Sequence, residues 1–172
     1  MIVSLTGFMG CGKSSTGREL AARLDARFID LDGEIVARTG RSIPDIFREG
    51  GETAFRAVEL ETLRAVLDEA DAAGQDTVLA LGGGALTRPE ARQLVFERSE
   101  CVWLRTRLET IRERLGAADA SRPLFQDAEA LFESRTPIYA QAPCVVDTDE
   151  KSPAEVADEI IILLRHQYLL CR

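Results

Sequence analysis

The sequence lacks several features that define large classes of proteins. It contains no asparagine, so N-linked glycosylation is excluded. It has one histidine, His166, and four widely spaced cysteines, so we expect neither a zinc site nor a disulfide framework. Its longest aliphatic run, Ile160–Leu164, is far too short to span a bilayer, and glycines and a lysine soon interrupt the apolar start. We therefore expect a cytoplasmic protein without a signal peptide or a membrane partner.

Lysine is also scarce, because Lys13 and Lys151 are the only two and nearly all other cationic side chains are arginines. The formal net charge is −8, which argues against binding to nucleic acids or anionic membranes. A local group of cations must therefore meet any anionic ligand. Arginine suits that task, since its guanidinium contacts a carboxylate or a phosphate through two parallel hydrogen bonds.

Short apolar runs alternate with longer stretches of helical periodicity. The predicted strands are Ile2–Thr6, Phe28–Leu31, Thr77–Leu81, Cys101–Leu104 and Cys144–Val146. The predicted helices are Lys13–Leu24, Thr53–Ala73, Pro89–Phe96, Leu108–Leu115, Ala128–Ala142 and a last one that begins at the capping box Ser152–Glu155. This order predicts an α/β fold of three layers, in which helices cover both faces of a five-stranded parallel sheet.

The chain of 172 residues has the size and the 45% hydrophobic content of one globular domain, and we expect residues 1–172 to form it. Two segments, 40–51 and 116–126, fit neither period and are candidates for mobile elements. Ligands of α/β sheets bind at the carboxyl ends of the strands, so the loops that follow each strand are the places to look for a site.

The first of these loops carries the clearest motif. Gly7–Ser14 reads GFMGCGKS, a full match to the phosphate-binding pattern GxxxxGK[ST], directly between a predicted strand and a predicted helix. Glycines let consecutive backbone N–H groups point at a phosphate, the lysine bridges the β- and γ-phosphates, and the serine hydroxyl ligates Mg²⁺. The candidate nucleotide-binding residues here are Gly10, Cys11, Gly12, Lys13, Ser14 and Ser15.

Among phosphate-loop proteins, a GTPase would need an [NT]KxD motif, and neither lysine is part of one. A transport or remodelling ATPase would need a longer chain. The kinases of small molecules and nucleoside monophosphates remain, in which a compact core carries a substrate-binding insert and a lid. We therefore predict a kinase that uses ATP and Mg²⁺.

The later motifs are ambiguous when taken singly. Asp30 and Asp32 end the second predicted strand, where alternation places both carboxylates on one side beside the phosphate loop, although a strand end followed by a helix cap explains them equally well. Arg56 and Glu59 are three residues apart on one helix face and can pair, as ordinary solvated pairs also do. A run of three glycines, 82–84, follows the third strand and permits close approach of a ligand.

Taken together and in order, the motifs resemble those of the shikimate kinase family from Ile2 to about Leu164. The phosphate loop matches the family form GxMGxGKS. The other matching motifs are the DxD pair at Asp30 and Asp32, FRxxE at Phe55–Glu59, GGG at Gly82–Gly84, RPL at Arg122–Leu124 and RxxxY at Arg135–Tyr139. The resemblance implies a nucleoside-monophosphate-kinase-like fold with a substrate-binding insert at about 32–60 and a lid at about 116–126.

The resemblance also implies a role for each motif. Ser14 and Asp30 would hold Mg²⁺, the latter through water, and Arg114 and Lys151 would flank the adenine. Lys13, Asp32 and Arg122 would be catalytic, with Asp32 binding the acceptor hydroxyls and Arg122 closing from the lid onto the nucleotide's transferring phosphate. The residues that would grip shikimate are Asp32, Arg56, Gly82, Gly83, Gly84 and Arg135, with Glu59 orienting Arg56.

The resemblance implies ATP-dependent phosphorylation of the 3-hydroxyl of shikimate, a step of aromatic amino-acid biosynthesis, by a protein that we expect to be a monomer. The alternatives are a kinase for another anionic polyol such as gluconate, a nucleoside-monophosphate kinase, and a catalytically silent ATP-binding regulator. Intact Lys13, Asp32 and Arg122 speak against the silent form. A further prediction is that Cys11, beside Lys13 and a helix amino end, is the cysteine most reactive to thiol reagents.

Overall fold

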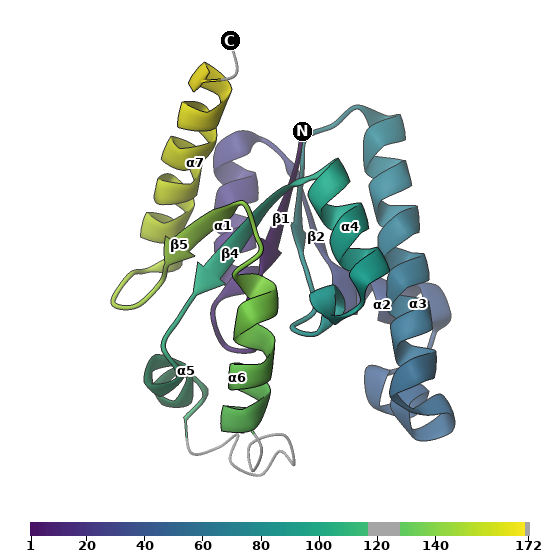
Figure 1. Cartoon of the computed structure of the whole chain (residues 1–172). Coiled ribbons are helices and arrows are strands. Elements are labelled where there is room, and N and C mark those ends of the chain that lie inside the picture. Colours follow the sequence, from purple (N-terminus) through teal and green to yellow (C-terminus); the bar gives the residue numbers. More distant parts are fainter. Residues whose placement is uncertain (117–127, 171–172) are drawn as a thin grey trace.

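The fold is built on a parallel sheet of five strands in the order β2-β3-β1-β4-β5 (Figure 1). The computed structural model describes residues 1–116 and 128–170, with side chains through residue 166. The strands are β1 (Ile2–Thr6), β2 (Arg27–Asp30), β3 (Thr77–Ala80), β4 (Glu100–Arg105) and β5 (Cys144–Asp147). All four pairings between neighbouring strands are parallel. The predicted sheet is therefore confirmed, with each strand boundary within one residue of its prediction.

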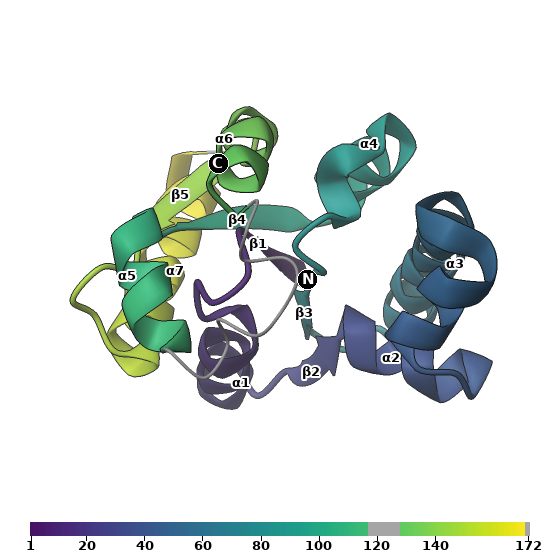
Figure 2. The same ribbon diagram turned by 90° about the horizontal axis from the view of Figure 1, so that it is seen from below.

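Helices cover both faces of this sheet (Figure 2). They are α1 (Lys13–Leu24), α2 (Leu31–Thr39), α3 (Ile43–Ala73), α4 (Pro89–Arg98), α5 (Leu108–Leu115), α6 (Ala128–Tyr139) and α7 (Pro153–Leu170), with a short 3₁₀ helix, η1, at Ala85–Thr87. Two separate cores result. One joins the sheet to α1 and α7, and the other joins its opposite face to α2, α3, α4 and α6.

Strand β4 shows how one apolar run serves both cores. Cys101 and Trp103 belong to the core beneath α3 and α4, whereas Val102 and Leu104 belong to the core beneath α1 and α7. Successive side chains of a strand point to opposite faces, so a strand that is covered on both faces carries apolar side chains on both. All four residues are buried, as the continuous apolar pattern predicted.

The prediction that the DxD pair lies on a strand is wrong for its second member. Strand β2 ends at Asp30, which is the N-cap of α2, and its carboxylate accepts hydrogen bonds from the backbone N–H groups of Asp32 (3.2 Å) and Gly33 (3.5 Å). Asp32 therefore lies in the first turn of a helix that the sequence pattern missed. An aspartate at this position satisfies N–H groups that have no partner within the helix, so capping ends the strand.

The segment 40–51, predicted to be irregular, is mostly helical. Gly40 ends α2 with a φ of 64°, and Ser42 caps α3 by accepting a hydrogen bond from the N–H of Asp45 at 3.2 Å. The departure from helical geometry inside α3 is at Gly51, where φ is 69° and ψ is −171°. The cap and an apolar stripe that includes buried Ile46 outweigh the glycines.

The start of α7 confirms the predicted capping box. Ser152 Oγ accepts a hydrogen bond from the N–H of Glu155 at 3.3 Å, and the Glu155 carboxylate accepts one from the N–H of Ser152 at 2.8 Å. Among the described residues, no helix is both long enough and apolar enough to cross a bilayer. The predicted lid lies, apart from Gly116, outside the described residues, and so do Arg122 and the rest of its RPL motif.

Candidate active site

The phosphate loop connects the carboxyl end of β1 to the amino end of α1, as the motif predicted. Gly7, Gly10 and Gly12 have φ angles of 142°, 76° and 101°, a region that side chains rarely adopt. A Cβ at Gly7 would also lie 2.8 Å from the carbonyl oxygen of Leu104 on β4. The Lys13 ammonium donates to the carbonyls of Gly7 (2.7 Å) and Phe8 (3.0 Å), so it lies over the loop.

This loop forms the floor of a cavity of about 520 Å³. The cavity reaches from the loop to the β5–α7 connection, and its lining includes Gly10, Cys11, Gly12, Lys13, Ser14, Ser15, Asp30, Asp32, Arg114, Thr148, Lys151 and Pro153. All the phosphate-loop candidates, together with Asp30, Arg114 and Lys151, thus line one space. Backbone N–H groups at a helix amino end next to a lysine suit a polyphosphate. Thr148 and Pro153 were not predicted as part of a site, because no motif marks Thr148 and the capping box that contains Pro153 predicts only the start of a helix.

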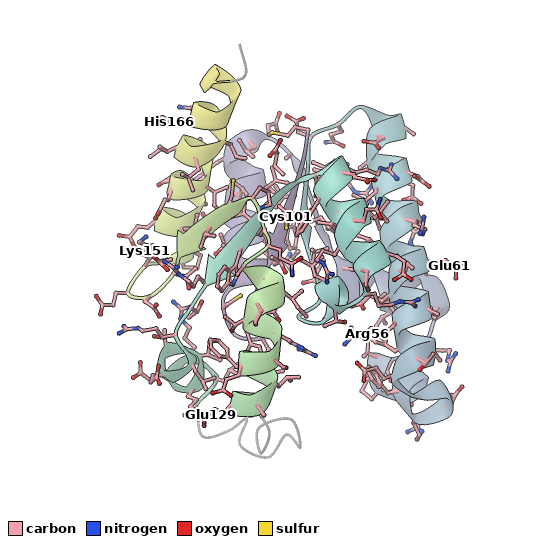
Figure 3. All side chains as sticks on the ribbon, viewed as in Figure 1. Arg56, Glu61, Cys101, Glu129, Lys151 and His166 are labelled. Carbon is pink, nitrogen blue, oxygen red and sulfur yellow. The ribbon has the colours of Figure 1, made fainter. Side chains whose placement is uncertain are left out.

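Arg114 and Lys151 line this cavity and are both held in place. Arg114 donates to the carbonyl of Thr148 at 2.6 Å and to that of Cys11 at 3.3 Å, so it ties α5 to the phosphate loop and to the chain after β5. Lys151 Nζ forms an ion pair with Glu159 on α7 at 2.5 Å. In Figure 3, Lys151 lies on the α7 side of the molecule and Arg56 on the α3 side.

Two oxygen donors meet beside the phosphate loop. The Ser14 hydroxyl donates to Asp30 Oδ2 at 2.6 Å. A hydroxyl and a carboxylate are the hard oxygen donors that Mg²⁺ prefers, with waters and nucleotide phosphates in its other positions. The pair therefore fits the metal that the motif implies. Within the described part of the chain, no group of three or more histidine, cysteine or acidic side chains could hold a metal.

A second cavity of about 330 Å³ adjoins the first. Asp32, Met9 and Gly83 line both, so the two spaces meet at these residues. Burial and the nearby charge of Asp30 raise the pKa of Asp32, although Lys13 and Arg56 act in the opposite direction. A carboxylate of raised pKa at such a junction is a stronger base towards a group that enters from the second cavity.

The second cavity joins a cationic end to an apolar wall. Arg56 and Arg135 line it, and so do Phe47 and Phe55, whose rings stack with centroids 4.5 Å apart. Glu52 lies at its edge, 3.4 Å from Arg56. Two arginines facing a small space, with apolar contacts beside them, suit a small anion that also carries a hydrocarbon ring.

The predicted pairing of Arg56 with Glu59 is confirmed, and the pair is buried rather than solvated. The guanidinium donates to Glu59 Oε2 at 2.7 Å, and the two side chains are only 10% and 4% exposed. Burial raises the pKa of Glu59 in spite of its bond to Arg56. Burying an ion pair costs desolvation free energy, so a pair of this kind adds little to the stability of the fold. A functional role for Arg56 and Glu59 explains their burial better than a stabilising one.

The glycine run brings these charged groups together, because larger residues would collide with them. A Cβ at Gly82 would lie 2.8 Å from both Asp32 Oδ1 and Glu59 Oε1. A Cβ at Gly84 would lie 2.2–2.8 Å from three atoms of the Arg56 guanidinium. Neither glycine has a positive φ, so close approach of side chains, and not backbone conformation, explains both.

The RxxxY motif places two functional groups beside Gly83. A Cβ at Gly83 would lie 3.6 Å from Arg135 Nη1, and the hydroxyl of Tyr139 donates a short hydrogen bond to the Gly83 carbonyl. The motif by itself indicates no function for Tyr139. His166, the one histidine of the sequence, is exposed on α7, far from Arg56 (Figure 3).

The prediction of a reactive Cys11 disagrees with its burial. Cys11 is 1% exposed, as deeply buried as Cys101 at 0%, because its side chain packs into the core beneath α1 and α7. Cys11 also lines the nucleotide-side cavity, and Lys13 Nζ donates to its sulfur at 3.8 Å. The burial of Cys11 nevertheless argues against fast reaction with a reagent in solution.

Comparison with known proteins agrees with this geometry. The family described as shikimate kinase matches residues 9–165. A shikimate kinase of Thermus thermophilus is 46% identical over 166 residues, covering 92% of this chain and 87% of the relative. Among solved structures, shikimate kinase from Acinetobacter baumannii in complex with shikimate superposes with a TM-score of 0.87 at 33% identity, covering 96% and 93% of the two chains.

Shikimate kinase from Aquifex aeolicus superposes with a TM-score of 0.82 at 35% identity, covering 98% of this chain and 99% of that one. The matches span nearly the whole chain and include both cavities. By sequence profile, by identity and by fold, the chain belongs to the shikimate kinase family, a family of ATP-dependent phosphotransferases.

Proposed function

We propose that this chain transfers the γ-phosphoryl group of ATP to the 3-hydroxyl of shikimate, giving shikimate 3-phosphate and ADP for aromatic amino-acid biosynthesis. The observation that carries the proposal is the meeting of two cavities at Asp32, one floored by the phosphate loop and the other lined by Arg56 and Arg135. Membership of the family and the relative that was solved with shikimate support it.

ATP binds along the first cavity. The N–H groups from Gly10 to Ser15 surround the β-phosphate, and Lys13 moves from the carbonyls of its own loop to the β- and γ-phosphate oxygens. Arg114 and Lys151, which line the same space, flank the adenine. Arg122 completes the nucleotide and catalytic set; it lies outside the described residues, and its role rests on the RPL motif alone.

Ser14 and Asp30 would hold Mg²⁺, Asp30 through water, and the metal would supply positive charge beside the transferring phosphate. Because Asp30 also caps α2, its carboxylate is kept in place by two backbone N–H groups. The same cap directs Asp32, two residues later, to the junction of the cavities. A single helix start therefore positions the metal-binding and the acceptor-binding carboxylates relative to each other.

Shikimate binds in the second cavity. Arg56 and Arg135 pair with its carboxylate, the glycine run contacts its ring hydroxyls, and Phe47 and Phe55 lie against the ring. Asp32 accepts a hydrogen bond from the attacking hydroxyl and takes its proton, a task that its raised pKa favours. Positioning and charge neutralisation carry most of the rate enhancement in phosphoryl transfer.

Residues 1–172 act as one domain, in which about 32–60 bind the acceptor and about 116–126 form the lid. We expect a monomer that works in the cytoplasm, without nucleic acid or membrane as a partner, in keeping with the net charge of −8. Light scattering after size-exclusion chromatography checks the oligomeric state, and a dimer mass at micromolar concentration would contradict that part of the proposal.

A coupled ADP-release assay with shikimate, gluconate and AMP in parallel tests the function. We expect turnover with shikimate only, dependence on Mg²⁺, and a product phosphorylated at the 3-position by phosphorus–proton NMR. ADP release with gluconate or AMP but not with shikimate would overturn the proposal. Nucleotide binding without turnover of any acceptor would instead indicate the silent regulator.

A further inference from the structure

Tyr139 connects two parts of the acceptor cavity that are far apart in the sequence. It is the last residue of α6, one helical turn after Arg135, and its side chain is 2% exposed. Residues four apart on a helix share a face, so both side chains reach from α6 towards the glycine run. The ring also packs against Trp103 of β4, with ring centroids 6.2 Å apart.

The Tyr139 hydroxyl donates to the carbonyl of Gly83, 56 residues away. The neighbouring carbonyls are satisfied locally: that of Gly82 accepts from the N–H of Ala85 at 3.1 Å, and that of Gly84 accepts from Thr87 N–H at 3.0 Å and Thr87 Oγ1 at 2.6 Å. Among these three carbonyls, that of Gly83 therefore differs, because in the described part of the chain it accepts its hydrogen bond from a distant element, α6. The bond fixes the peptide plane between Gly83 and Gly84.

This peptide plane is critical because of its surroundings. Gly83 lines both cavities, and a Cβ there would lie 3.6 Å from Arg135 Nη1 and from the N–H nitrogen of Met9 in the phosphate loop. Without side chains, the run is held only through its backbone, and glycine has the largest conformational freedom of any residue. An outside anchor at Gly83 therefore sets the distance between the run, Arg135 and the phosphate loop.

The phenol is suited to a permanent anchor. Burial raises the pKa of Tyr139, and the nearby positive charge of Arg135 opposes that effect without reversing it. The hydroxyl therefore keeps its proton, and its role as donor, throughout the pH range of an enzyme assay. A bond to a carbonyl oxygen requires a protonated donor, so the hydrogen bond from Tyr139 to Gly83 should persist throughout that pH range.

We propose that Tyr139 is a positioning residue for the acceptor: its hydrogen bond holds the glycine run in register with Arg135, so that both walls of the cavity are aligned before shikimate enters. The inference rests on the proposed function and extends it to a residue that need not touch the substrate. When the cavity is aligned in advance, binding of the acceptor does not have to supply the free energy of ordering it. Loss of this alignment therefore weakens the binding of shikimate and leaves the binding of ATP largely unaffected.

The test is Tyr139→Phe, which keeps the ring between Trp103 and the glycine run and removes only the hydroxyl. The matched control is Thr136→Val on the same helix, whose hydroxyl donates to the Phe132 carbonyl within α6 at 2.7 Å. We expect Tyr139→Phe to raise the KM for shikimate about fivefold or more, the usual cost of one buried hydrogen bond. The KM of Tyr139→Phe for ATP should stay within about twofold of the parent's value. The control, Thr136→Val, should match the parent in the KM values for both shikimate and ATP.

Hydrogen exchange of the ligand-free proteins gives a second readout that does not depend on activity. Amides of residues 83–87 should exchange faster in Tyr139→Phe than in the parent and in Thr136→Val. A residue that served stability alone would lower the melting temperature and leave the KM ratio of the two substrates unchanged. An unchanged KM for shikimate, or equal exchange at 83–87, would overturn the inference; a parent that does not turn over shikimate would instead overturn the proposed function.

Discussion

Replacing Arg56 with alanine perturbs two properties that can be measured separately. The guanidinium lines the acceptor cavity and also pairs with Glu59 at 2.7 Å, where the two side chains are 10% and 4% exposed. Alanine therefore removes a ligand for the substrate carboxylate and leaves a buried carboxylate without its partner. The first loss affects the KM for shikimate, and the second affects the free energy of unfolding.

Both effects should be large because so little solvent reaches the pair. Leaving one member of a buried pair alone costs about 3–5 kcal/mol, which corresponds to a fall in melting temperature of about 6–20 °C for a chain of this size. Loss of a desolvated contact to a bound carboxylate costs about 2–5 kcal/mol. At 1.4 kcal/mol for each factor of ten, the KM for shikimate should rise from about 30-fold to a few thousandfold.

The stability loss should depend on pH in a definite direction. Burial already raises the pKa of Glu59 in the folded parent, and removing Arg56 takes away an attraction that lowers it, so the folded pKa rises further. A carboxyl whose folded pKa is raised contributes stability at low pH that is lost as the pH rises through the folded value. The melting temperatures of parent and variant should therefore be furthest apart near pH 8 and converge towards pH 4.

Two further variants separate the effects. In Arg56→Met/Glu59→Met, neither charge remains, so stability should recover while the KM for shikimate stays high. Arg98→Ala is the matched control, since Arg98 also forms two ion pairs, with Asp68 and Asp71, but lies outside both cavities. Its partners are more than half exposed, so a stability loss of about 1 kcal/mol or less is expected. An unchanged KM for shikimate in both Arg56 variants would refute the carboxylate assignment.

Three other variants test the junction of the cavities. Asp32→Asn should lower kcat about 10²- to 10⁴-fold. It should also raise the melting temperature at pH 7, because the raised pKa of Asp32 means that the folded state favours the uncharged form. This gain in melting temperature should vanish near pH 3, and a lower melting temperature at pH 7 would contradict the prediction. Gly82→Ala should raise the KM for shikimate about tenfold or more, since the new Cβ would displace the Asp32 and Glu59 carboxylates. Its control is Gly33→Ala, whose Cβ would meet Asp30 Cβ at 3.9 Å. Equal KM values in the two variants would argue against the steric explanation. Ser14→Ala should raise the Mg²⁺ concentration for half-maximal activity about tenfold or more, and an unchanged Mg²⁺ titration would remove Ser14 from the metal site.

Local patterns were sufficient where one element could be recognised by itself. Short apolar runs predicted all five strands within one residue. The signal is strongest in the central strands β3 and β4, because a strand that is covered on both faces carries apolar side chains on both. The phosphate loop was equally clear, since its glycines and lysine are neighbours in the chain and act together. The sequence also predicted that Asp30 and Asp32 lie beside the phosphate loop. It did not predict that Asp32 lies in a helix, because residues 30–32 fit both the alternation of a strand and the cap of a helix.

The amino-acid sequence by itself therefore determined the five strands, the phosphate loop and the helices other than α2 and the first part of α3, all of which depend on residues close together in the chain. Only the tertiary structure decided that Cys11 is buried, that the Arg56–Glu59 pair is desolvated, and that Gly82 and Gly84 must lack side chains. The bond between Tyr139 and Gly83 belongs to the same group. Each of these depends on the distance between segments brought together by packing, and no local pattern encodes how closely two distant segments approach.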